Sequence, residues 1–182
     1  GLILFSWLIL LLWLIATLET RNNGFFRQKR IGRHKKLFSI VKIRTMKEAP
    51  SFKSSVTTYD DPRITFFGKF LRRYKLDELP TLWNVLRGDM SIVGPRPDVP
   101  GYADKLKGED RRILELRSGI TGPATLKYAS EGQILANVND PIKYNNEVIF
   151  PDKVRINLEY MDNWSLWTDI KIVFKTIFRK NY

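Results

Sequence analysis

Apolar side chains dominate the beginning of the chain. Residues 2–18 are hydrophobic apart from Ser6 and Thr17, and no side chain before Glu19 ionises. A helix of this length rises about 25 Å, slightly less than the roughly 30 Å thickness of a bilayer's hydrocarbon core. Residues 1–18 are therefore predicted to form a membrane-embedded helix, spanning or re-entrant, with residues 19–182 as one membrane-associated domain. A buried core helix is the alternative.

Shorter patterns follow in the next part of the chain. Residues 37–44 alternate between apolar and polar positions, which predicts a β-hairpin over residues 25–44 with its turn at 32–36. Phe66, Phe67, Phe70 and Leu71 recur at helical spacing and predict the apolar side of a helix over residues 64–74. A second helix should begin near Leu79-Pro80, since proline is favoured in a first turn, and end before Gly88.

The second half of the chain predicts further short elements. Residues 91–93 form a brief extended stretch, which the Gly-Pro-Arg-Pro segment 94–97 ends. We expect a helix over residues 104–117, a turn at 119–122, and a basic amphipathic helix over 164–178. That last helix either lies on a membrane surface or packs on the domain. The expected fold class is α+β and mostly helical, with a short β-hairpin and several amphipathic helices at the membrane surface.

The distribution of charge predicts the side of the membrane on which the domain lies. The chain has 31 Lys and Arg against 19 Asp and Glu, a formal net charge of +12. Ten cations and no acid occur within residues 21–47. These are Arg21, Arg27, Lys29, Arg30, Arg33, Lys35, Lys36, Lys42, Arg44 and Lys47. Juxtamembrane cations stay on the cytoplasmic side and bind anionic headgroups, so the domain is expected in the cytosol, against anionic membrane lipids.

Candidate chemistry is concentrated between residues 72 and 96. Asp77 and Glu78 are adjacent carboxylates at a predicted helix entry, with Arg72, Arg73 and Arg96 flanking them in sequence. Arginine suits phosphate oxygens, and nearby cations should lower the pKa of a carboxyl and keep it ionised for nucleophilic attack or for Mg²⁺. The alternative is an acidic pair that only favours the helix dipole. The absence of cysteine and the single histidine exclude disulfides, thiolate metal sites and two-His mechanisms.

Five blocks of sequence are similar to one known family, in that family's order. They are FFRQKRIGR at 25–33, FSIVKIRTM at 38–46, the segment Asp60–Pro97 that contains LDELPTLWNVLRGDMSIVGPRP, RSGITGPA at 117–124, and NLEYMDNWSLWTDIKI at 157–172. On these blocks the chain resembles the bacterial sugar transferase family, the monotopic phosphoglycosyl transferases. The resemblance extends over essentially the whole chain.

The resemblance implies an enzyme of the bacterial inner membrane that acts at its cytoplasmic face. It would transfer a sugar 1-phosphate from a UDP-sugar to polyprenyl (undecaprenyl) phosphate and release UMP, the first membrane step of glycoconjugate assembly. Asp77 would be the nucleophile that carries the phosphosugar and would also hold Mg²⁺. Glu78 would position the metal or deprotonate the acceptor. Lys42, Arg72 and Arg96 would contact phosphate.

Three other functions compete with this interpretation. The same fold could serve as a catalytically inactive membrane scaffold. A sequence pI of about 10.0, with aromatic residues among the cations, is also typical of nucleic-acid-binding proteins, although the apolar first segment argues against nucleic acid as a partner. An enzyme could instead use a single displacement in which Asp77 only holds Mg²⁺.

Overall fold

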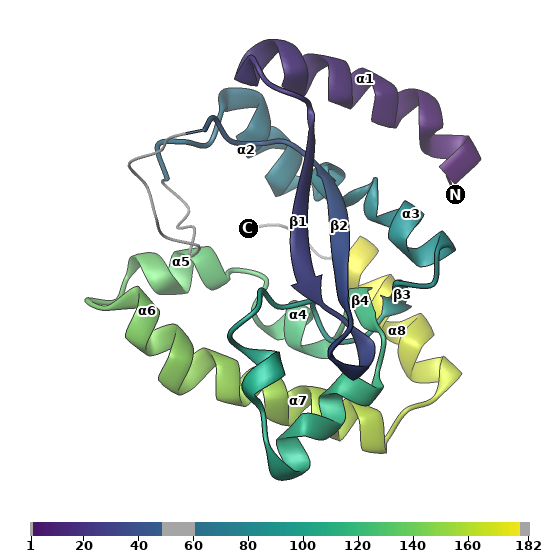
Figure 1. The fold of residues 1–182 in the computed structure, drawn as a ribbon, viewed down its shortest axis with the longest axis vertical. Coiled ribbons are helices and arrows are strands. Elements are labelled where there is room, and N and C mark those ends of the chain that lie inside the picture. The colour runs from purple at the N-terminus through teal and green to yellow at the C-terminus, as the bar shows by residue number, and fades with distance from the viewer. Residues whose placement is uncertain (1, 49–60, 179–182) are drawn as a thin grey trace. The chain divides into compact units, whose positions relative to one another are not determined.

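The chain folds into two compact units, shown together in Figure 1. The computed structural model describes residues 2–48 and 61–178. The first unit consists of residues 1–28 and 39–87, and the second of residues 29–38 and 88–182. The boundary between the units crosses a β-hairpin, so both of its strands contribute residues to both units.

The hairpin is formed by β1 (Phe25–Ile31) and β2 (Leu37–Ile43), which pair in a two-stranded sheet. A single 3₁₀ turn, Arg33–Lys35, joins them. The turn is closed by the backbone N–H of Gly32, which donates to the carbonyl of Lys36 at 2.9 Å. The predicted hairpin and the position of its turn are therefore confirmed.

Helix α1 (Leu2–Thr20) has one face packed in the first unit and another face exposed. Ile9, Leu12 and Ala16 are buried in one cluster with Ile43 and Leu71. Six large apolar residues of the helix are exposed: Leu4, Trp7, Leu10, Leu11, Leu14 and Leu18. Among the described residues, no helix has the length and apolar character that crossing a bilayer requires. The predicted helix is present, and its place in a membrane stays a prediction.

The predicted helices of residues 64–86 are also present in the first unit, as α2 (Phe66–Arg73) and α3 (Thr81–Leu86). The expected apolar side of α2 is only partly correct, because Leu71 is fully buried while Phe66 is 90% exposed. The reason is the close approach of Gly68 to the backbone of Thr45. A Cβ atom at Gly68 would lie 2.2 Å from the Thr45 carbonyl oxygen, which turns the Gly68 face inward and leaves Phe66 outside.

Buried Asn84 attaches α3 to β2. Its Nδ2 donates to the carbonyl of Ser39 at 2.8 Å, and its Oδ1 accepts from the N–H of Val41 at 3.2 Å. Asn84 is only 2% exposed, and its buried amide is satisfied by a backbone carbonyl and a backbone N–H of β2. These bonds fix the strand one residue before Lys42.

The second unit contains a sheet of two parallel strands, β3 (Met90–Val93) and β4 (Ser118–Thr121). Val93 pairs with Thr121 in the register of the sheet. The prediction of a turn at residues 119–122 is wrong because this glycine-rich segment is a strand. Its glycines permit close backbone contact rather than a reversal: a Cβ atom at Gly119 would lie 2.2 Å from the nitrogen of Gly94.

Helices complete the second unit. The predicted helix over residues 104–117 is replaced by two 3₁₀ segments, Ala103–Lys105 and Gly108–Glu115. The following elements are α4 (Pro123–Lys127), α5 (Glu131–Ala136), α6 (Pro141–Tyr144), a π-helical turn (Asn145–Ile149), α7 (Phe150–Asp162) and α8 (Leu166–Ile177). The predicted C-terminal amphipathic helix is confirmed as α8, which buries Ile172 with Val93 and Tyr160. The α+β, mostly helical class is confirmed as well.

We predict that Asn84→Ala lowers the free energy of unfolding by about 2–4 kcal/mol, because it removes two hydrogen bonds to the backbone of β2 and the contacts of a buried side chain. Leu86→Gln on the same helix is the control, since Leu86 is 70% exposed and should change stability little. Denaturant unfolding of both variants in detergent tests the expectation. Equal stability of the two variants would contradict the role assigned to Asn84.

Candidate active site

Asp77 and Glu78 lie on a tight turn between α2 and α3. The turn is a single 3₁₀ segment, Leu76–Glu78, and Lys75 before it has a left-handed backbone with φ of 58°. The hydroxyl of Thr81 donates to the carbonyl of Glu78 at 2.5 Å and so attaches the turn to α3. The first turn of α3 itself contains no acidic residue. A role limited to the dipole of α3 therefore does not fit the position of the pair.

The two adjacent carboxylates have different surroundings. Glu78 forms an ion pair with Lys42 of β2, with 2.6 Å between Nζ and Oε1. Both side chains are largely buried: that of Lys42 is 15% exposed and that of Glu78 is 11% exposed. A pair with so little solvent access depends on both partners, because removal of one leaves the other charge buried. The carboxylate of Glu78 is thus engaged in the ion pair with Lys42.

Asp77 is buried without such an ion pair. The residue is 9% exposed, and its Oδ1 is buried with no hydrogen-bond partner among the described residues. Burial is the largest cause that raises the pKa of the Asp77 carboxyl, and the neighbouring charge of Glu78 raises it further. The cations Lys42, Lys75 and Arg72 act in the opposite direction. The expectation of a lowered pKa is therefore wrong, because desolvation outweighs the cations.

Arg72 is fixed by a hydrogen bond to Thr45, which follows the end of β2. Its Nε donates to the hydroxyl of Thr45 at 2.9 Å, and Thr45 is itself only 6% exposed. The charge of Arg72 lowers the pKa of Asp77 and also contributes to lowering that of Asp61, whose main cause is its ion pair with Arg63. The first unit therefore brings Asp77, Glu78, Lys42 and Arg72 together, as the sequence predicted.

Arg96, the remaining predicted site residue, belongs to the second unit. It is exposed on the turn that follows β3. The backbone of this turn is fixed at two points: Gly94 donates to the carbonyl of Thr121 at 2.9 Å, and Gly119 donates to that of Pro95 at 2.8 Å. Arg96 therefore projects from a rigid segment.

Three residues that shape the site are not among the site residues predicted from the sequence. Asn84 fixes the strand next to Lys42, Thr45 holds Arg72, and Lys75 supplies both a charge near Asp77 and the left-handed residue before the turn. Asn84 alone had a visible signal, as a polar residue inside the apolar stretch Leu82–Leu86. The roles of Thr45 and Lys75 follow from contacts between segments distant in sequence or from backbone geometry.

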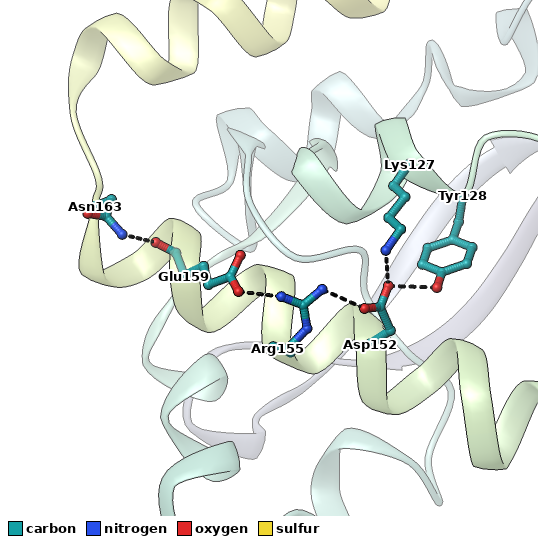
Figure 2. Close-up of polar contacts among 6 residues, drawn as sticks. All are labelled: Lys127, Tyr128, Asp152, Arg155, Glu159 and Asn163. Atoms are coloured by element: carbon teal, nitrogen blue, oxygen red, sulfur yellow. Dashed lines mark hydrogen bonds and ion pairs between the residues drawn. The ribbon is translucent and has the colours of Figure 1, made fainter.

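A second polar network in the second unit centres on Asp152 (Figure 2). Its Oδ2 accepts from Lys127 and from the Tyr128 hydroxyl, both at 2.6 Å, and its Oδ1 accepts from Arg155 at 2.7 Å. Arg155 continues the network to Glu159. These donors, Lys127 first, hold the pKa of Asp152 well below its usual range, while burial and Asp152 raise the pKa of Tyr128 to about 12. The network attaches the end of α4 to α7.

The donor set around Asp77 fits Mg²⁺ only with help from a substrate. Within residues 2–48 and 61–178, no three His, Asp or Glu side chains gather into a metal cluster. Mg²⁺ is nevertheless commonly bound by one or two carboxylates together with substrate phosphates and water. The Oδ1 of Asp77 is available for such a contact, whereas Glu78 is engaged by Lys42.

Comparison with known proteins agrees with these features. The chain matches the bacterial sugar transferase family over residues 1–180. It is 36% identical over 187 residues to the UDP-glucose:undecaprenyl-phosphate glucose-1-phosphate transferase of Escherichia coli K12. That match covers 98% of this chain and 37% of the Escherichia coli protein. It is 35% identical to the exopolysaccharide production protein ExoY of Sinorhizobium fredii, covering 97% of this chain and 78% of that protein.

A third relative shows how the lengths differ. The galactosyl transferase CpsE of Streptococcus agalactiae is 35% identical over 87% of this chain, and the match spans only 35% of CpsE. The chain thus spans about a third of CpsE and of the Escherichia coli protein, and about three quarters of ExoY. The carboxylate turn with its cations therefore occurs in a chain that matches one family over nearly its whole length. The chain belongs to the bacterial sugar transferase family.

We predict a strong energetic coupling between Lys42 and Glu78. Lys42→Met should lower the free energy of unfolding, because it removes the counter-charge of the ion pair from largely buried Glu78, and Lys42→Met/Glu78→Gln should recover part of the loss. A double-mutant cycle is expected to give a coupling of about 1–3 kcal/mol. Additive effects of the two single substitutions would contradict the pair as described.

Proposed function

We propose that this protein transfers a sugar 1-phosphate from a UDP-sugar to polyprenyl phosphate, with release of UMP. The observation that carries the proposal is the pair of unlike carboxylates on the turn before α3. Glu78 is held by Lys42, while the Oδ1 of Asp77 is buried near cations and accepts no hydrogen bond from residues 2–48 and 61–178. Two of the relatives are named for the transfer of glucose or galactose phosphate to undecaprenyl phosphate.

The first step is attack by Asp77 on the β-phosphorus of the UDP-sugar. A bond forms between the carboxylate oxygen and phosphorus, the bond from phosphorus to the UMP oxygen breaks, and UMP leaves with that electron pair. Covalent catalysis of this kind divides one difficult displacement into two easier ones. A carboxylate oxygen without a hydrogen-bond donor has its lone pairs available for this attack, and the small 3₁₀ turn limits its movement.

The second step returns the enzyme to its starting state. A phosphate oxygen of polyprenyl phosphate attacks the phosphorus of the aspartyl phosphosugar, and the bond to Asp77 breaks. The products are polyprenyl diphosphate sugar and the free carboxylate. Glu78 and Lys42 lie next to this centre, where the pair would orient Asp77 and accept a proton from the acceptor phosphate.

Phosphate charge must be offset during both steps. Arg72 carries a fixed guanidinium close enough to Asp77 to lower its pKa, and Lys75 adds a second cation there. Mg²⁺ bound by Asp77 together with the diphosphate would neutralise further charge and stabilise the departing UMP. Arg96 is a candidate for a further phosphate contact from the second unit.

We also propose that α1 lies in the membrane and holds the site at the cytoplasmic surface of the bacterial inner membrane. Its exposed face consists of leucines and Trp7, while its other face is packed against the first unit. The cations of residues 21–47 follow directly and suit anionic headgroups. This placement brings a soluble nucleotide and a lipid-bound acceptor to the same catalyst.

Covalent labelling tests the nucleophile. With a UDP-sugar labelled in its β-phosphate, the native protein should acquire label that polyprenyl phosphate removes, and Asp77→Asn should acquire none. Asp110→Asn, at an exposed aspartate of the second unit, is the matched control and should label normally. Label on Asp77→Asn would exclude Asp77 as the carrier, and no label or UMP release with any sugar would favour an inactive scaffold.

Fluorescence quenching tests the position of α1. In variants that retain a single tryptophan, phospholipids brominated in the acyl chain should quench Trp7, which is 66% exposed. Trp13 should be quenched much less, because it stacks on Phe25 and donates to Asn23. Equal quenching of the two residues, or none of Trp7, would contradict the proposed orientation.

A further inference from the structure

Glu19 is the only side chain of α1 that ionises. It lies in the last turn of the helix, between exposed Leu18 and buried Thr20. A carboxylate is costly here, because it follows a run of apolar residues and has the same sign of charge as anionic headgroups. The candidate active site does not include Glu19, whose contact lies on a different helix.

The carboxylate of Glu19 contacts the start of α2. Its Oε1 accepts a hydrogen bond from the backbone N–H of Phe67 at 3.0 Å, although the two residues are 48 positions apart in sequence. Its Oε2 is buried with no hydrogen-bond partner in residues 2–48 and 61–178. The first N–H groups of a helix have no partner within that helix and form the positive end of its dipole, which favours a carboxylate. Glu19 therefore caps α2 from a separate helix.

The start of α2 is also attached to the segment that follows β2. Thr65, the N-cap residue, accepts from the N–H of Gly68 at 2.9 Å, and its own N–H donates to the carbonyl of Thr45 at 3.1 Å. One hydrogen bond thus holds the first turn of α2 to the segment after β2, and the bond from Glu19 holds it to the end of α1 (Figure 1).

Apolar packing joins the same two helices. Leu12 and Ala16 of α1 are buried in one cluster with Leu71 of α2, and Phe67 packs against that cluster. Apolar attraction has no preferred direction, whereas a hydrogen bond to a carboxylate fixes one donor against one acceptor. Glu19 therefore supplies the directional contact that sets the position of α2 along α1.

The other end of α2 leads to the candidate active site. Arg72 lies in the last turn of this helix, and two residues separate the helix from the 3₁₀ turn that carries Asp77. A helix of eight residues is only about 12 Å long and behaves as a short rigid element. A displacement of its first turn is therefore passed on to Asp77.

The bonds that hold the charged groups of the site together do not involve α1. Arg72 donates to Thr45, and Lys42 pairs with Glu78. Without the contact from Glu19, these groups would keep their mutual arrangement but would move as a set relative to α1.

We propose that Glu19 is a positioning residue, which fixes α2 and the turn with Asp77 relative to α1. The inference rests on the proposed function, in which α1 lies in the membrane and the acceptor phosphate is held at the membrane surface. The UDP-sugar reaches Asp77 from solution, so the first step depends on groups that stay together. The second step joins Asp77 to a lipid, so it depends on the position of the turn relative to the embedded helix.

Separate measurement of the two steps in lipid vesicles tests this role. Glu19→Met removes the acceptor of the Phe67 N–H, and it should leave the rate of phosphosugar transfer from the UDP-sugar to the enzyme nearly unchanged. Transfer from the enzyme to polyprenyl phosphate should be about ten- to a hundred-fold slower, the effect of a misplacement of roughly 1 Å. Glu19→Gln keeps an oxygen that can accept the hydrogen bond, so it should restore most of the rate of this second step.

Glu115→Met is the matched control, since it makes the same substitution at an exposed glutamate of the second unit, and both of its steps should proceed as in the native protein. Equal slowing of the two steps in Glu19→Met would indicate a general structural role and would overturn the proposal. A native rate of the second step in Glu19→Met, or a rate in Glu19→Gln as slow as in Glu19→Met, would overturn it as well.

Spin-label distances give a readout that does not depend on catalysis. The chain has no cysteine, so Leu4→Cys on α1 and Lys69→Cys on α2, both at exposed positions, can be labelled specifically. The distribution of distances between the two labels should be narrow with Glu19 or Glu19→Gln and should be broader or shifted with Glu19→Met. The same distribution in all three proteins would overturn the positioning role.

The two measurements also separate this inference from the proposed function. If the native protein takes no phosphosugar from any UDP-sugar, the proposed function is refuted, and the spin-label distances still decide whether Glu19 positions α2. If the native protein completes both steps and the distances do not respond to Glu19→Met, the proposed function stands and the role of Glu19 is refuted.

Discussion

The ion pair between Lys42 and Glu78 is the interaction on which the catalytic arrangement depends. Two carboxylates on one short turn would repel each other, and the charge of Glu78 does raise the pKa of Asp77. Lys42 engages Glu78 and at the same time acts on Asp77 in the opposite direction. One ammonium group thereby gives the two acids different states: Glu78 is paired and positioned, and Asp77 is buried with an oxygen that accepts no hydrogen bond from the described part of the chain. The strand that carries Lys42 is in turn held by Asn84.

The helix proposed to lie in the membrane and the carboxylates proposed for catalysis both belong to the first unit. Helix α1 contributes Ile9, Leu12 and Ala16 to the same core as Ile43 of β2 and Leu71 of α2. Lys42 lies next to Ile43, and Arg72 lies next to Leu71, so the residues that support the charged site pack directly on the apolar helix. A helix whose other face is exposed leucine can therefore hold the site at a fixed depth in a lipid surface.

Patterns local in sequence predicted a large part of this structure. The hairpin, α2, α3 and α8 follow from alternation, helical spacing and the placement of proline and glycine. Strand β4 was missed because Gly119–Gly122 has the composition of a turn, while its strand conformation arises from pairing with β3, nearly thirty residues earlier. The 3₁₀ segments over 103–115 have helical periodicity without the backbone hydrogen bonding of an α-helix. In the site, the sequence identified the charged groups but not their burial, and burial decides the sign of the pKa change at Asp77.

The most direct measurement is the release of UMP in the absence of any lipid acceptor. The enzyme is mixed rapidly with an excess of a UDP-sugar that it accepts, and UMP is followed within the first turnover. If Asp77 is the carrier, UMP appears in an amount that matches the active sites, before polyprenyl phosphate is added. If UMP appears only after the acceptor arrives, the sugar phosphate passes directly between substrates, and the account of Asp77 as its carrier is wrong.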